Sequence, residues 1–172
     1  IIDLARDSEP ASRLVAVAQV ERMLLNGRSP SDELKQAMLE RLEDVDPTIR
    51  SMTARLLDAM GLEDLGSRLV AAISRENEPE VQVAMFVILG NRPVLAIIPL
   101  AAACFSKPLV ALSDASAGAV VAVASAGLLD DDARTAVLDG PGFRRSCLPT
   151  LSLATVAVLL SDISPPRAQR NK

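Results

Sequence analysis

Apolar residues recur along this chain in helix-length stretches, and each stretch follows a polar turn that contains proline or small residues. Three of the turns contain Pro10, Pro47 and Pro79, and the fourth is the small-residue segment 113–118. Proline suits the first turn of a helix, because the amide hydrogen that it lacks would have no helical partner there. The pattern therefore predicts helices over 10–23, 47–60, 79–89 and 113–129.

The clearest of these stretches is 47–60. Its apolar residues recur at roughly helical spacing and indicate one buried stripe, made of Ile49, Met52, Leu56 and Met60. Asp46 directly precedes the proline, where a carboxylate favours a helix N-terminus. Gly61 follows at the place where helices commonly end. The polar turn, the apolar stripe and the final glycine therefore all predict a helix with one buried face.

Each of these helices is expected to have a partner helix. The partners are predicted to begin at Ser31, to cover 62–75, and to cover 93–112 with a break or kink at Pro99 and Pro108. We predict one domain over 1–163 and a flexible tail over 164–172. The domain consists of repeats near 1–27, 31–61, 62–91 and 93–129, followed by C-terminal helices over 130–162.

The segment Asp46-Pro47-Thr-Ile49-Arg50, continuing to Met60-Gly61, resembles the second helix of a HEAT repeat. Proline-to-proline spacings of 37 and 32 residues, and 39 from Pro79 to Gly118, suit two-helix repeats. The chain is thus similar to the HEAT-like family, including the bacterial PBS-lyase/HEAT-like repeats. The resemblance implies an all-α fold: a right-handed α-α superhelix, or HEAT-like solenoid, of about four two-helix repeats.

The resemblance also implies where a partner would bind, because the second helices of such solenoids line a concave surface. Arg13, Arg50, Arg55 and Gln82 fall on the predicted second helices. An arginine row there would bind acidic groups of a partner through bidentate hydrogen bonds. The alternative is structural: Arg50 would bond Asp44 or Asp46 of its own or an adjacent repeat.

The composition argues against several kinds of chemistry. The chain has no histidine, which removes the commonest general base and metal ligand. Cys104 and Cys147 lack zinc-site spacing and are expected to be buried free thiols. The run Asp130-Asp131-Asp132 lacks the ligand spacing of a calcium loop, so we interpret it as a helix-capping charge cluster. We therefore predict no catalytic residue, no metal and no cofactor.

The segment 93–129 is unusually apolar, since Lys107 and Asp114 are its only charged residues. One interpretation is a membrane-inserted hairpin, because 93–113 approaches the length of a span. A second is two buried helices of the solenoid. A third is an exposed apolar patch that a partner, or another part of the polypeptide, covers.

The function expected from the sequence is a non-catalytic protein–protein interaction or scaffold module. Its partner would be a protein or another domain of the same chain, because the first residues, Ile1-Ile2-Asp3, lack an initiator methionine and indicate a piece of something longer. A net charge of −4 argues against nucleic acid. Of 18 basic residues only Lys35, Lys107 and Lys172 are lysine, a bias that indicates a bacterial and, we expect, cytoplasmic protein. The oligomeric state stays open.

Two alternatives are a membrane-associated helical segment of a transporter or secretion component, and a HEAT-like DNA glycosylase. The glycosylase would be expected to stack bases on aromatic residues and to carry a basic groove. The chain has no Trp or Tyr and only three Phe, which disfavours that alternative.

Overall fold

The computed structural model describes residues 1–104, 109–130, 132 and 137, and every regular element in that part of the chain is helical. The all-α class predicted from the sequence is therefore confirmed there. Two short 3-10 helices, η1 (Arg41–Glu43) and η2 (Leu95–Ile97), precede α4 and α7. The α-helices are α1 (Ile2–Ala5), α2 (Pro10–Leu25), α3 (Asp32–Glu40), α4 (Pro47–Ala59), α5 (Leu65–Ile73), α6 (Pro79–Asn91), α7 (Ile98–Cys104) and α8 (Val110–Ser125).

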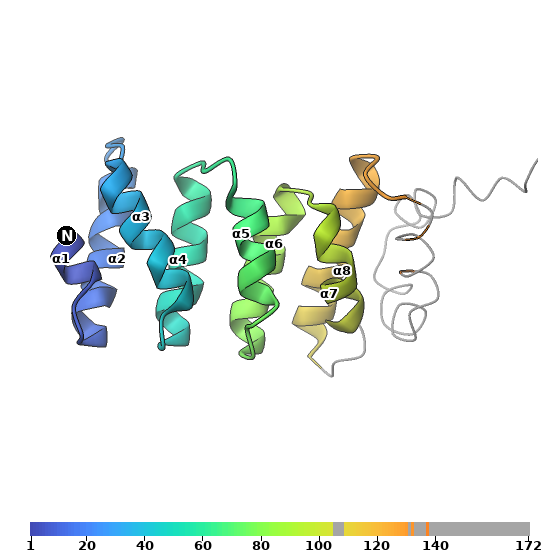
Figure 1. Ribbon diagram of the computed structural model, residues 1–172, viewed down its shortest axis with the longest axis horizontal. Coiled ribbons are helices and arrows are strands. Elements are labelled where there is room, and N and C mark those ends of the chain that lie inside the picture. Colours follow the sequence, from blue (N-terminus) through green and yellow to red (C-terminus); the bar gives the residue numbers. More distant parts are fainter. Residues whose placement is uncertain (105–108, 131, 133–136, 138–172) are drawn as a thin grey trace, which may run out of the picture.

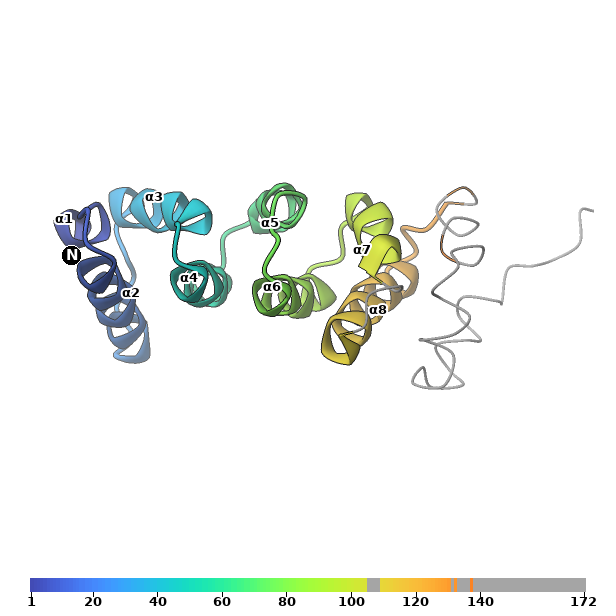
Figure 2. The same ribbon diagram turned by 90° about the horizontal axis from the view of Figure 1, so that it is seen from below.

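Consecutive helices lie as pairs, and the pairs follow one another along the long axis of the molecule (Figure 1). Seen from below, the helices form two layers: α1, α3, α5 and α7 in one, and α2, α4, α6 and α8 in the other (Figure 2). In this view α2 and α8 extend farther from the first layer than α4 and α6 do, so the second layer is the concave side. Within it α2 packs on α4, α4 on α6, and α6 on α8.

The helix boundaries follow from local chemistry. Pro10, Pro47 and Pro79 are the first residues of α2, α4 and α6, as the sequence predicts. The Asp46 side chain accepts a hydrogen bond from the Thr48 amide, which has no helical acceptor. Gly61, at the end of α4, has a φ of 69°, a left-handed conformation that costs glycine little. A first-turn proline thus marks the start of all three helices, and a cap and a terminal glycine add to it in α4.

Two predicted boundaries near the fourth pair are wrong. The last second-layer helix begins at Val110 rather than near 113, because Leu112 and Ser113 are already buried on its inner side. The helix expected over 93–112 is instead η2 followed by the short α7, and Pro99 lies in the first turn of α7 without breaking it. Pro108, the C-terminal helices over 133–162 and the tail 164–172 fall outside the described residues, apart from Val137.

A continuous apolar core joins the two layers. Met38, Leu57, Leu69, Phe86 and Leu112 are among its fully buried side chains. Part of the apolar segment 93–129 belongs to this core, since η2, α7 and α8 each contribute buried residues. Cys104 is buried and forms no disulfide within the described residues, as predicted. Among the described helices, none combines the length and the apolar character needed to span a membrane.

Candidate functional site

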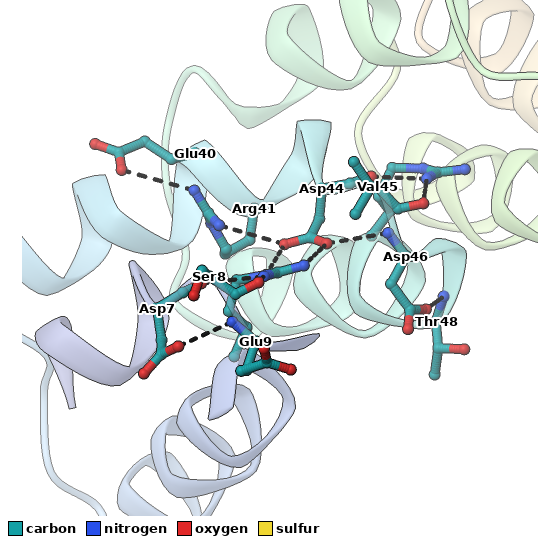
Figure 3. Close-up of polar contacts among 11 residues, drawn as sticks. Asp7, Ser8, Glu9, Glu40, Arg41, Asp44, Val45, Asp46 and Thr48 are labelled. Carbon is teal, nitrogen blue, oxygen red and sulfur yellow. Dashed lines mark hydrogen bonds and ion pairs between the residues drawn. The ribbon is translucent and has the colours of Figure 1, made fainter. Parts of the chain in front are cut away.

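A carboxylate recurs three residues before the first residue of α2, α4 and α6. In each case it accepts a hydrogen bond from the backbone amide two residues later, at 2.8–3.0 Å; the acceptors are Asp7, Asp44 and Glu76. Figure 3 shows the Asp44 carboxylate between the Arg41 side chain and the Asp46 amide. These bonds fix the turn that leads into each second helix.

Arg13 joins the first helix pair to the second. Its Nε and Nη2 donate to the two carboxylate oxygens of Asp44 at 2.6 and 2.9 Å. Its Nη1 donates to the carbonyl oxygens of Asp7 and Ser8, in the turn before its own helix. The Arg13 and Asp44 side chains are only 6% and 1% exposed. Such a bidentate pair, with its remaining donor also satisfied, is a structural clamp between helix pairs.

Arg50 repeats this arrangement one helix pair later. Its Nε and Nη2 donate to Glu76 at 2.6 and 2.8 Å, and its Nη1 donates to the carbonyl oxygens of Asp44 and Val45. We call each such unit a rung: an arginine at the fourth position of a second helix, bound to the carboxylate of the next pair. The described residues contain two rungs, Arg13–Asp44 and Arg50–Glu76.

Gln82 occupies the fourth position of α6, where a third rung would need an arginine. Its Nε2 donates to the carbonyl oxygen of Glu76 at 2.6 Å, which preserves the bond to its own turn. The sequence has no Asp or Glu between positions 81 and 113 that could serve as the next carboxylate. A buried guanidinium without a carboxylate would be costly, so the neutral amide suits this position.

The rungs shift the ionisation of their members. Burial by itself would raise the pKa of Asp44 and of Glu76. Hydrogen bonds from the arginine and from backbone amides outweigh that effect, so the pKa of each carboxyl lies below its ordinary value. Both carboxylates are therefore charged at neutral pH, and the rungs are complete ion pairs.

The four predicted partner-binding residues thus fall into two groups. Arg13, Arg50 and Gln82 point into the turns and hold the structure together, which is the alternative that the sequence left open for Arg50. Its carboxylate partner is Glu76 of the next pair, whereas Asp44 contributes a carbonyl oxygen. Arg55 is exposed on the second layer. Within the described residues its side chain makes no hydrogen bond or ion pair.

Arg55 lines two neighbouring grooves of the second layer. The α2/α4 groove is lined by Val17, Glu21, Leu24, Leu25, Met52, Arg55, Leu56 and Ala59. The α4/α6 groove is lined by Arg55, Asp58, Val83, Ala84, Val87, Ile88 and Asn91. Each groove has an exposed aliphatic side chain: Leu25 is 82% exposed and Val87 56% exposed. We call the two grooves together the Arg55 face.

Sequence reasoning missed the apolar part of this face. Leu25 and Val87 belong to separate helix pairs and are 62 positions apart in the sequence, so periodicity within one helix does not bring them together. Glu76 was missed for the same reason, although its place three residues before Pro79 matches that of Asp44 before Pro47. That shared offset was the available signal.

The described residues offer no group of three His, Cys, Asp or Glu side chains that could hold a metal ion. Asp131, in the centre of the acidic run, and Cys147 lie outside the described part. Comparisons with family models, curated proteins and solved structures found no match to this chain.

Proposed function

We propose that this chain is a non-catalytic binding module, and that it holds a protein, or another domain of its own polypeptide, on the Arg55 face. The observation that carries the proposal is an exposed arginine that makes no side-chain hydrogen bond or ion pair within the described residues and lines two grooves, each with an exposed aliphatic side chain. Arginine and large apolar side chains together are characteristic of protein interfaces. The rungs hold α2, α4 and α6 in a fixed arrangement around Arg55.

We further propose that the helix pairs are repeats of a HEAT-like solenoid. The layered order of the pairs and the first-turn prolines support this fold, as does the rung that recurs at the same place in successive pairs. Repeat arrays contact mainly their neighbours and present extended concave surfaces to partners. The Arg55 face lies on the concave layer.

Binding fits this site better than catalysis does. The chain has no histidine to act as a general base. The acidic neighbour of Arg55 in the α4/α6 groove, Asp58, is held by Arg92 at 2.7 Å. Both grooves are partly open to solvent, whereas catalytic groups usually need a water-excluding pocket.

The test is affinity purification from the native host with three versions of the tagged protein: wild type, Arg55→Glu and Arg28→Glu. Arg28 is the matched control, because it is exposed, lies outside both grooves and has no side-chain partner within the described residues. We expect one protein to be retained by the wild type and by Arg28→Glu, and lost with Arg55→Glu. Equal retention by all three versions, or retention of nothing, contradicts the proposal.

A further inference from the structure

We infer that the Arg55 face recognises an amphipathic helix of the partner, with an acidic residue between two apolar ones that lie two turns apart. This inference rests on the proposed binding function and names the chemistry of the ligand. The partner's apolar side chains would enter the α2/α4 and α4/α6 grooves. Its carboxylate would bind the guanidinium of Arg55 between them.

Charge complementarity selects the acidic residue. The positive charge of Arg55 has no ion-pair acceptor within the described residues, although Glu21 lines one adjoining groove and Asp58 the other. The Asp58 carboxylate already accepts from Arg92, which also donates to the Leu62 carbonyl oxygen. Glu21 would repel an acid placed deep in the α2/α4 groove. A carboxylate is therefore favoured above α4 itself, where it can bind the guanidinium fork of Arg55.

Each groove can take an apolar side chain of a partner. The α2/α4 groove has a volume of about 410 Å³ and the α4/α6 groove about 280 Å³. Both are partly open to solvent, whereas small-molecule pockets enclose most of their ligand. Leu25 in the α2/α4 groove and Val87 in the α4/α6 groove each expose more than half of their surface to water. Covering them with apolar side chains removes that surface from water and favours binding.

The spacing of the grooves indicates a helix. The grooves flank α4, so their separation is about one helix–helix distance, roughly 8–10 Å. Residues i and i+7 of an α-helix lie on one face about 10.5 Å apart, with i+3 and i+4 between them. In an extended strand, residues three apart span about 10 Å but point to opposite faces. A helix laid across α2, α4 and α6 thus presents all three side chains at once.

The experiment is a selection from a displayed library of helical peptides, randomised at positions i, i+3, i+4 and i+7. We expect enriched peptides to carry Asp or Glu at i+3 or i+4 and large apolar residues at i and i+7. Fluorescence anisotropy of the synthetic peptides should then show a Kd at least about 10-fold weaker for Arg55→Glu. It should be unchanged for Arg28→Glu. Arg55 makes no side-chain hydrogen bond or ion pair within the described residues, so circular dichroism should show all versions folded.

Charge reversal gives the decisive comparison. A peptide whose acid is replaced by lysine should bind Arg55→Glu better than it binds the wild type. If the enriched peptides lack an acid, or if no peptide is enriched, while the native partner is still lost with Arg55→Glu in the affinity purification, the helix–acid inference is wrong and the binding function stands. If the native partner is retained equally by Arg55→Glu, both proposals are wrong.

Discussion

The second and third helix pairs are joined differently from the third and fourth. Between the second and third, Arg50 crosses to Glu76 through two hydrogen bonds and donates two more to the turn before its own helix. Between the third and fourth, α6 packs on α8. A Cβ atom on Gly90 would lie 4.0 Å from the backbone of Gly118, and both helices contribute buried apolar residues such as Phe86 and Val120. One junction is directional and charged; the other depends on apolar packing.

The comparison shows that one stacking arrangement can be stabilised by two kinds of interaction. A bidentate arginine–carboxylate pair specifies distance and orientation, and so fixes how one pair sits on the next. Apolar packing tolerates several arrangements of similar energy, and depends on close contact between small residues. The charged junctions flank α4, which carries Arg55. The more exactly positioned part of the array is therefore the part that we propose binds a partner.

The largest loss of stability is expected from Arg50→Leu, which breaks the charged junction between the second and third pairs. This substitution leaves the Glu76 carboxylate, whose side chain is 4% exposed, without its counter-ion, and we expect a loss of about 3–5 kcal/mol in the free energy of unfolding. Urea denaturation followed by circular dichroism measures it. Arg75→Leu is the matched control: it removes the exposed Arg75–Glu43 pair between the same two helix pairs, and should cost about 0–1 kcal/mol. Equal losses would show that the buried rung has no special role.

Acid should weaken the charged junctions and spare the apolar one. Asp44 and Glu76 have pKa values lowered from ordinary values of 3.8 and 4.5. The unfolded chain therefore takes up their protons first as pH falls. The stabilisation is complete above about pH 5 and is lost below it. We expect a smaller loss than for Arg50→Leu, because a protonated carboxyl keeps some hydrogen bonds.

The measurement is the slope of the unfolding free energy against pH between 3 and 6, for the wild type and for Asp44→Asn/Glu76→Gln. The double variant should be less stable at pH 7 and show a flatter slope. An unchanged slope would mean that other carboxyls cause the acid sensitivity.

The apolar junction can be broken at Gly66 of α5. A Cβ atom at this position would lie 2.6 Å from Cγ2 of Val94, at the start of the fourth pair. Overpacking typically costs about 1–3 kcal/mol, and the better helix propensity of alanine returns up to about 1 kcal/mol. We expect Gly66→Ala to be destabilised by roughly 1 kcal/mol, with no change in acid sensitivity. Val94→Ala in the same chain should recover part of the loss; no recovery would assign the cost elsewhere.

The sequence predicted the beginnings of α2, α4 and α6, because proline and a preceding acid are local signals. It misplaced the start of α8, where neither signal is present. Residue type alone could not show which of the predicted site residues are structural and which is exposed, because Arg50 and Arg55 are both arginines of the same helix. Five positions correspond to about 140° around a helix, so the two cannot share one face. Which of them points to solvent depends on Glu76, a contact across 26 positions.

The smallest effect is expected at Gln82, where the charged junctions give way to the apolar one. Gln82 is the neutral counterpart of Arg50, and its side chain is buried without carrying a charge. Gln82→Leu removes the bond to the Glu76 carbonyl oxygen and should cost about 1 kcal/mol, the usual value for one neutral hydrogen bond. Gln19→Leu on the exposed side of α2 is the control, with an expected change within about 0.5 kcal/mol. Urea denaturation measures both. A loss for Gln82→Leu as large as that for Arg50→Leu would place the third junction among the polar ones and remove the distinction.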